Sequence, residues 1–464
     1  MAKETELERY MSYLCEALGH ADRHQSLGDY CRGLMLPIER KSVEPLAAHV
    51  EPYRVSAKHQ SLHHFVAKSE WSDESMLERV RDWVVSRMHL KAGSFWIVDD
   101  TGFPKKGKHS VGVARQYCGQ LGKQDNCQVA VSLSVASEEA SLPVAYRLYL
   151  PEQWAGDQER RDKTGVPDGI EFKTKPEIAL EQIRRAKESG LTPGVVLADA
   201  AYGTDTSFRE EITRLELPYC VGVQPGVSVW APGTQPLPAK PRQKMGRPPT
   251  LLRRGPGHEP VSVKTLAQGL NKKSWRTVCW REGSAGKKRS RFAAVRVRPA
   301  HRDNWRERLR EQEWLLVEWP KGEVEPTKYW LSTLPANMSR KKLVKTAKMR
   351  WRIERDYQEL KQELGLGHYE GRGWRGFHHH ATLTIAAYGF LAAQRLSSGG
   401  VKKNIVRPKA PALPEDYTPR GCGTNAAPRS RLNCDLALSD RPQDRARTAS
   451  LSRLRVEGIP FMTQ

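Results

Sequence analysis

The stretch SFWIVDDTGF, residues 94–103, decides how the rest of the chain is interpreted. Its continuous apolar run is typical of a strand buried on both faces. The run ends on two adjacent carboxylates, Asp99 and Asp100. Neighbouring like charges are unfavourable unless a cation lies close by. We therefore expect one of the two aspartates to bind a cation, with the other as its neighbour.

Further strands and helices follow this first strand. The order predicts three strands, a helix, a fourth strand and a second helix, which is an α/β arrangement. The fourth strand ends on Asp199, and a later helix over 339–365 carries Glu354. The strands expected after the first are 126–137, 142–151 and 194–203, and the two helices are 175–190 and 205–217.

Changes in composition divide the chain into five parts. Residues 1–90 have helical periodicity and predict an N-terminal helical domain, which either binds DNA or is a purely structural cap. Residues 91–218 and 311–396 form the two parts of a core, separated by 219–310, a β-rich insertion with Pro, Gly and basic residues. Residues 397–464 are basic with little periodicity, which predicts a disordered tail.

The charge of the chain predicts a polyanionic partner. The 464 residues include 76 Lys and Arg against 53 Asp and Glu, a net charge of +23. Such an excess favours nucleic acid, although a basic protein without a DNA role has the same composition. The start of the chain lacks the apolar region of a signal peptide, and no apolar stretch is long enough for a bilayer. We expect a cytoplasmic, nucleoid-associated protein with no membrane partner.

Three carboxylates are candidate metal ligands. Asp100 and Asp199 end strands, where ligands of α/β sheets gather, and Glu354 lies on a helix that could pack across that edge. Carboxylate oxygens suit Mg²⁺, and three of them could hold two ions that clamp a phosphoryl transfer. Each residue also has an ordinary interpretation, because strand-end aspartates cap turns and a helical glutamate between arginines forms ion pairs.

Three motifs then resemble those of a known family. IVDDTG (97–102), LADAAYG (197–203) and RWRIERDYQELK (350–361) are similar to the signatures of DDE-type insertion-sequence transposases. That family has a ribonuclease H-like core, so the resemblance implies a mixed sheet flanked by helices, with a β-rich insertion before the glutamate. It also implies Asp100, directly before Thr101, rather than Asp99 as first ligand. The tyrosine of the family's helix signature is replaced by Ala347.

The resemblance further implies an activity and a set of partners. The reaction would be metal-dependent nicking of transposon ends, followed by joining of the freed 3′-hydroxyl to target DNA. The cofactor would be two Mg²⁺ ions, with Mn²⁺ as a substitute. The partners would be double-stranded DNA and further copies of the chain, in a homodimer or higher assembly.

Basic side chains supply candidate DNA contacts. Arg350 and Lys361 share a helix face with Glu354 and would hold phosphates, or else pair with nearby glutamates. Two basic segments could line the DNA path, and their candidate residues are Lys105, Lys106, Arg115, Lys287, Lys288 and Arg289. The run His378 to His380 is expected on the surface or facing DNA, because consecutive helical residues cannot share one metal ion.

Two other functions remain open at this stage. A domesticated, non-catalytic DNA-binding protein would keep the basic surface, although intact carboxylates argue against it. A structure-specific nuclease on the same core would cut branched DNA without requiring repeat sequences. The β-rich insertion and the long glutamate helix favour transposition over the nuclease.

Overall fold

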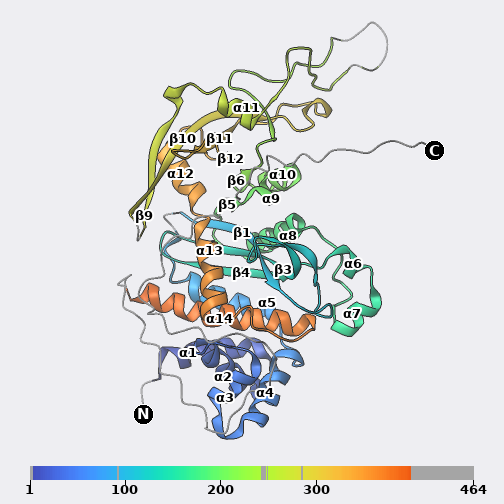
Figure 1. Cartoon of the computed structure of the whole chain (residues 1–464), viewed down its shortest axis with the longest axis vertical. Coiled ribbons are helices and arrows are strands. Elements are labelled where there is room, and N and C mark those ends of the chain that lie inside the picture. Colours follow the sequence, from blue (N-terminus) through green and yellow to red (C-terminus); the bar gives the residue numbers. More distant parts are fainter. Residues whose placement is uncertain (1–3, 91–92, 242–246, 248, 284–285, 399–464) are drawn as a thin grey trace, which may run out of the picture.

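A computed structural model describes residues 4–90, 93–241, 247, 249–283 and 286–398. In Figure 1 the N-terminal helices lie at one end, α14 (Trp374–Ser397) separates them from the central strands, and β9–β12 lie toward the other end. The predicted tail falls almost entirely outside the described residues. None of the described helices has the length and apolar character that a membrane span requires.

Five α-helices form the N-terminal part. Thr5 begins the first helix with a capping box, in which Glu8 returns a hydrogen bond to the Thr5 backbone. Tyr10 reaches α14, where its hydroxyl donates to the carbonyl of Ala386 at 2.9 Å. The helices are α1 (Glu6–Cys15), α2 (His24–Met35), α3 (Val43–Val50), α4 (Val55–Ala67) and α5 (Asp73–Val85).

A mixed sheet of twelve strands runs through the described part of the chain, in the order β2-β3-β1-β5-β6-β12-β11-β10-β7-β8. Strands β1, β5 and β6 are parallel neighbours, and the other pairs are antiparallel. In addition, β4 pairs with β3, and β9 pairs with β10. The bounds are β1 (Phe95–Pro104), β2 (Ala114–Cys118), β3 (Lys123–Ala136), β4 (Ser141–Leu148), β5 (Val195–Ala198), β6 (Tyr219–Val223), β7 (Ser228–Trp230), β8 (Val261–Ser262), β9 (Arg276–Gly283), β10 (Gly286–Pro299), β11 (Glu313–Trp319) and β12 (Lys328–Ser332).

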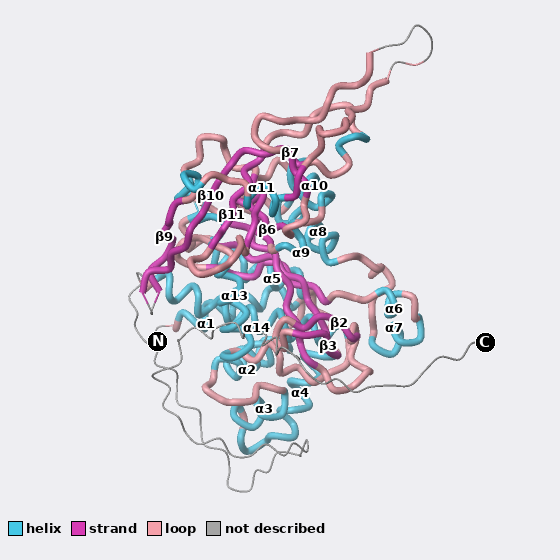
Figure 2. The backbone as a smooth tube through the Cα atoms, turned by 45° about the horizontal axis from the view of Figure 1, so that its top comes forward, coloured by secondary structure: helices cyan, strands magenta, loops and turns pink. Residues whose placement is uncertain are grey.

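Helices cover both faces of the strands that surround β1, and Figure 2 shows the strands as a central band between them. On one face, α8 lies over β3, where Gln182 donates to the carbonyl of Val131 at 3.0 Å. On the other face, Tyr357 of α13 lies 2.7 Å from the hydroxyl of Ser132 in β3. The remaining helices are α6 (Glu152–Ala155), α7 (Gln158–Thr164), α8 (Lys175–Glu188), α9 (Ala200–Gly203), α10 (Thr206–Arg214), α11 (Val263–Gln268), α12 (Arg340–Lys348) and α13 (Trp351–Gln358).

The predicted fold class is confirmed: a large mixed sheet is flanked by helices, as expected for a ribonuclease H-like core. The prediction of one long helix over 339–365 is wrong. The chain leaves α12 at Lys348, begins α13 at Trp351, and finishes in a π-helical turn over Glu359–Glu363.

The expectation of surface histidines at the start of α14 is also wrong. His378, His379 and His380 are buried, with at most 6% exposed. His379 lies within 3.1 Å of the carbonyl of Val66, and His380 lies 2.9 Å from the hydroxyl of Tyr30. Burial lowers the pKa of both imidazoles to about 4. His379 and His380 therefore join α14 to the N-terminal helices, whereas His378 accepts from the backbone nitrogen of Leu148 in β4.

Candidate active site

Asp99 and Asp100 lie on opposite faces of β1. In the antiparallel register with β3, Asp99 is opposite Ser132 and Asp100 is opposite Val131. Residues opposite one another share a face, and successive residues alternate between faces. Asp99 therefore lies on the face covered by α13. Asp100 lies on the α8 face, where its Oδ2 accepts a hydrogen bond from Lys175 Nζ at 2.6 Å.

The register of the parallel strands aligns Asp99 with Asp199. Ile97 of β1 is paired with Leu197 of β5, and each aspartate comes two residues later. The backbone of Asp199 is still extended, so the alternation of side chains continues to it. Asp99 lies within β1, which continues past the predicted strand end to Pro104, and Asp199 directly follows β5. Their side chains are on the same face of the sheet. Asp100 has the opposite orientation.

Asp99 is a largely buried carboxylate, with 14% of its side chain exposed. Burial raises the pKa of Asp99 to about 7; the charges of Asp199 and Asp100 raise it too, against the opposing effect of Arg350. Arg350 Nη1 donates to Asp99 Oδ2 at 2.7 Å. This carboxylate therefore lies where a further cation would be strongly stabilising.

Arg350 connects the three carboxylates. It precedes α13, and its Nη2 donates to Glu354 Oε1 at 3.2 Å, one helical turn further on. Burial acts to lower the pKa of Arg350, but the charges of Asp99, Glu354 and Asp199 outweigh it and raise the pKa. Carboxylates from β1, from the end of β5 and from α13 thus surround one guanidinium.

Asp199 also determines how the chain leaves β5. Its Oδ1 accepts from the backbone nitrogen of Ala201 at 2.8 Å and from that of Tyr202 at 3.4 Å, so it caps α9. Asp199 therefore caps a turn, and it also lies beside the other carboxylates of the candidate site. Its Oδ1 is used by the cap, while Oδ2 has no hydrogen bond in the described part of the chain.

Two tyrosines that the sequence did not single out border the site. Besides contacting Ser132, the Tyr357 hydroxyl donates to the carbonyl of Asp99 at 3.3 Å. The Tyr202 hydroxyl is buried and has no hydrogen-bond partner among the described residues. Burial raises the pKa of Tyr202 well above its usual value, and the charges of Asp100, Asp99 and Asp199 contribute. Tyr357 follows Glu354 by three residues, a spacing that places both on one helix side.

The donor chemistry of the site fits a hard divalent cation, because Asp99, Asp199 and Glu354 offer carboxylate oxygens around a buried position. Within the described residues, however, no three His, Cys, Asp or Glu side chains are close enough together to hold a metal ion. The guanidinium of Arg350 contacts both Asp99 and Glu354. The arginine thus supplies positive charge where an ion would otherwise be needed.

Lys361, which the sequence placed on one helix face with Arg350 and Glu354, contacts the backbone of β1 at Gly102. Its Nζ donates to the carbonyl of Gly102 at 2.7 Å and to Gln120 Oε1 at 3.3 Å. Burial lowers the pKa of Lys361 to about 8. Lys361 lies within the π-helical turn Glu359–Glu363, which changes the phase of the helix, so Lys361 does not continue the Arg350–Glu354 face in a straight line.

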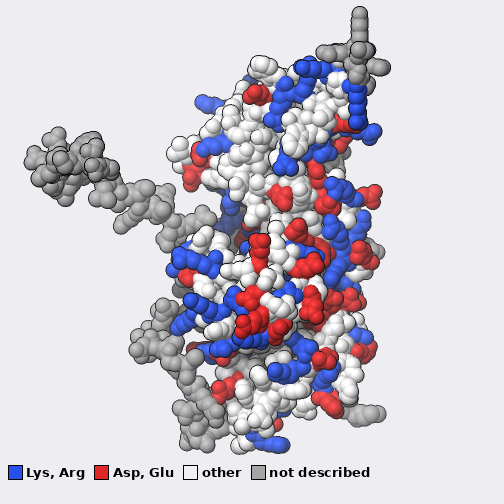
Figure 3. All heavy atoms as spheres, turned by 90° about the vertical axis from the view of Figure 1, so that its right-hand side faces the viewer, with Lys and Arg blue, Asp and Glu red and all other residues white. Residues whose placement is uncertain are grey.

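The other predicted DNA contacts fall into two groups, one near β1 and β2 and one on β10. Lys106 and Arg115 are exposed near β1 and on β2, whereas Lys105 donates to the carbonyl of Tyr369 at 2.9 Å. Lys287 and Arg289 are exposed on β10, and Lys288 is half-buried. On the face shown in Figure 3, basic and acidic side chains are interspersed, so this face is not uniformly positive.

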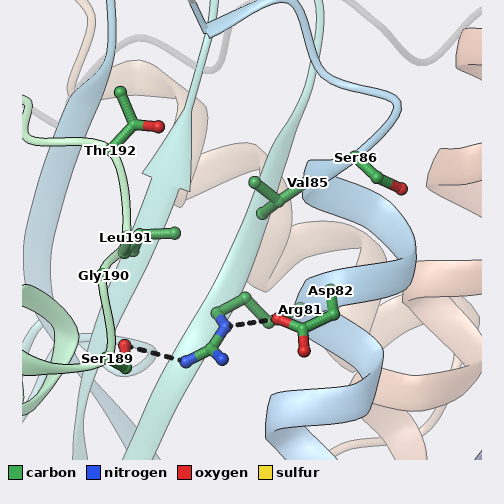
Figure 4. Close-up of a pocket in the computed structure, with 8 residues that line it drawn as sticks. All are labelled: Arg81, Asp82, Val85, Ser86, Ser189, Gly190, Leu191 and Thr192. Carbon is green, nitrogen blue, oxygen red and sulfur yellow. Dashed lines mark hydrogen bonds and ion pairs between the residues drawn. The ribbon is translucent and has the colours of Figure 1, made fainter.

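A surface pocket of about 230 Å³ lies away from these carboxylates, between α5 and the loop that follows α8. Figure 4 shows Arg81 among its lining residues, with the guanidinium donating to Asp82 at 2.9 Å and to Ser189 at 3.0 Å. The charged group of the pocket is therefore already paired. Its lining includes no second basic residue, and we assign it no ligand.

Comparison with known proteins gives the family. Residues 13–287 match the model of the DDE superfamily endonucleases, which is more than half of the 464 residues. The chain belongs to this family. The match includes Asp99, Asp100 and Asp199 and ends before α13. The inclusion of Glu354 in the candidate site is therefore based on its contact with Arg350.

One relative of this DDE endonuclease is a probable transposase for insertion sequence element IS701 from Microchaete diplosiphon. The two are 32% identical over 166 residues, which is 36% of this chain. The matched part spans 40% of the length of the relative. The similarity therefore concerns a part of each protein.

Proposed function

We propose that this chain is the transposase of an insertion sequence, which nicks DNA at the ends of its element and joins the freed 3′-hydroxyl to target DNA. The DDE family and the name of the relative support this function. The observation that carries it is the common register of Asp99 and Asp199, together with the Arg350 guanidinium that links them to Glu354.

Asp99, Asp199 and Glu354 would hold the divalent cation, and Asp99 takes the place that the resemblance gave to Asp100. Mg²⁺ is the expected ion, bound as a pair, and Mn²⁺ is the expected substitute. When bound, such a pair stabilises the charge on the attacking and leaving oxygens of a phosphoryl transfer. For binding, the Arg350 guanidinium has to release Asp99, because it contacts the same carboxylate oxygens.

Arg350 then has a second task. Once released from Asp99, its planar fork can bind two oxygens of a DNA phosphate beside the carboxylates. Tyr357 keeps the backbone of Asp99 in place through its hydrogen bond to the Asp99 carbonyl. We assign Lys361 to holding β1 at Gly102, because its ammonium is directed to that carbonyl.

Double-stranded DNA, as transposon ends and as target, is the proposed partner of the basic surfaces. The N-terminal helices would bind one part of the DNA, and the exposed cations of β2 and β10 would contact its phosphates. A homodimer or higher assembly would bring two ends together, since each end needs its own set of carboxylates. Such binding would weaken steeply with salt, because each phosphate contact releases a counterion.

Metal-dependent cleavage tests this function. The full chain is incubated with DNA that carries the terminal inverted repeats of its element, with Mg²⁺ or with EDTA. We expect cleavage that requires Mg²⁺ and is lost in Asp99→Asn, Asp199→Asn and Glu354→Gln, with DNA binding retained. Glu188→Gln, at an exposed helix end, is the control that keeps cleavage. Full activity in any of the three site variants would remove that residue from the site.

The same experiment distinguishes the alternatives. Salt-sensitive binding without metal-dependent cleavage would indicate a non-catalytic DNA-binding protein. Cleavage of branched DNA that lacks the repeats would indicate a structure-specific nuclease. Either outcome would contradict the transposase function while leaving the fold and the family unchanged.

A further inference from the structure

The tip of the β2–β3 hairpin presents apolar side chains to solvent. Tyr117 is 60% exposed and Leu121 is 42% exposed, although both are large and apolar. Burying such side chains against a partner would be favourable. Tyr117 lies near the end of β2, and Leu121 lies in the turn between β2 and β3. The turn is therefore a candidate contact surface.

This hairpin tip is anchored next to the candidate active site. Gly102 of β1 lies so close to Cys118 that a Cβ at position 102 would be 2.9 Å from the Cys118 sulfur. From the turn, Gln120 Oε1 accepts from Lys361 Nζ at 3.3 Å, and the same ammonium donates to the carbonyl of Gly102 at 2.7 Å. Because Gly102 is three residues beyond Asp99, the anchor lies roughly 10 Å along the strand from that aspartate.

The side chains around the tip combine aromatic and cationic character. Arg115 and Tyr117 are two residues apart in β2, so they lie on one face, and both are exposed. Cys118 lies on the opposite, buried face. Lys123 begins β3 with 66% of its side chain exposed and lies 3.2 Å from Asp125. An exposed aromatic ring flanked by cations is the pattern that binds a nucleotide by stacking on its base and neutralising its phosphate.

We propose that Tyr117 and Leu121 form a stacking platform for an unpaired DNA base that flanks the scissile phosphate, with Arg115 on the adjoining phosphate. The inference rests on the proposed function and adds a base contact to it. The base has to be unpaired, because a base within a duplex has both faces covered by its neighbours. The rigid anchor at Gly102 and Lys361 keeps the platform at a fixed distance from the carboxylates.

Fluorescence of 2-aminopurine tests the platform. One probe is a duplex with a short single-stranded overhang that carries 2-aminopurine, and the second probe is the same sequence fully paired. Both are bound in EDTA, so that no cleavage intervenes. We expect the overhang probe to be quenched by the wild-type chain and by Tyr117→Phe, but not by Tyr117→Ala. Affinity of Tyr117→Ala for the overhang probe should fall roughly tenfold or more, with less than a twofold change for the paired probe.

Trp305→Ala is the matched control, because Trp305 is 69% exposed but lies in the short helical turn Asp303–Trp305 between β10 and β11. It should leave the quenching unchanged. Equal quenching by Tyr117→Ala and the wild-type chain would overturn the platform, and so would a change in oligomeric state of Tyr117→Ala, which would indicate a protein contact. Failure of the wild-type chain to bind either probe would instead contradict the proposed function.

Discussion

The adjacent aspartates of β1 lie in different environments on the two faces of the strand. Asp99 is 14% exposed, faces α13 and shares Arg350 with Glu354, whereas Asp100 is 30% exposed and pairs with Lys175 of α8. The α13 face gathers three carboxylates around one cation. The α8 face holds a one-to-one ion pair, which needs no further charge. The comparison shows that a strand can place two neighbouring acids in separate environments, and we propose the α13 face as the metal site.

The largest expected difference concerns the two aspartates themselves. Asp99→Asn should lower the cleavage rate by about 1,000-fold or more, because loss of a ligand removes several kcal/mol of charge stabilisation. Asp100→Asn should lower it by less than about tenfold, since it breaks a partly exposed ion pair. Single-turnover cleavage of end DNA measures both. Equal losses of cleavage rate in the two variants would contradict the assignment of different roles to the two faces.

Replacement of Arg350 tests whether the arginine substitutes for an ion. In Arg350→Met the carboxylates lose their counterion, so the melting temperature without metal should fall. Added Mg²⁺ should then raise the melting temperature more in this variant than in the wild-type chain, because no guanidinium competes for Asp99. Thermal unfolding with and without Mg²⁺ measures the effect. An identical Mg²⁺ response in both proteins would contradict the competition.

Lys175 tests the other face. Lys175→Met should cost about 1 kcal/mol or less in unfolding free energy, because both partners of the ion pair are partly exposed. Cleavage should change by only a few fold, in contrast with the loss expected for Asp99→Asn. Denaturant unfolding and the cleavage assay give the two numbers. A loss of cleavage comparable to that of Asp99→Asn would indicate that the reaction takes place on the α8 face.

Lys361 gives the smallest effect and a dependence on pH. Its folded pKa of about 8 lies below the ordinary value of 10.5, so the unfolded chain binds more protons between these values. Stability contributed by this group should therefore increase as the pH rises from about 8 to about 10.5. Lys361→Met should flatten that part of the curve, as measured by denaturant unfolding at each pH. An unchanged slope would show that the lysine is not buried as described.

Much of the fold followed from local pattern. The apolar run before Asp99, the alternating residues of β3 and β4 and the periodic α8 are each typical of one element type, and the structure has them. The break between α12 and α13 was not predictable, because no Pro or Gly marks Met349 and Arg350. The strand β2 was also missed, since its five residues are bordered by glycines and carry no apolar alternation.

The candidate site was predicted in outline, and we propose Asp99 in place of Asp100 as its first ligand. The sequence places both acids at the strand end, but only the pairing of Ile97 with Leu197 shows which side chain points toward α13. A register is a long-range property that local pattern does not contain. The prediction that the histidines lie on the surface was wrong for a related reason. Their partners, such as Tyr30 and Val66, are more than 300 residues away in the chain.

Anomalous diffraction from crystals of the full chain soaked in Mn²⁺ tests the central claim most directly. We predict an anomalous peak bounded by Asp99, Asp199 and Glu354, with Arg350 moved away from Asp99 and Asp100 still paired with Lys175. A peak coordinated by Asp100 in place of Asp99 would contradict the account.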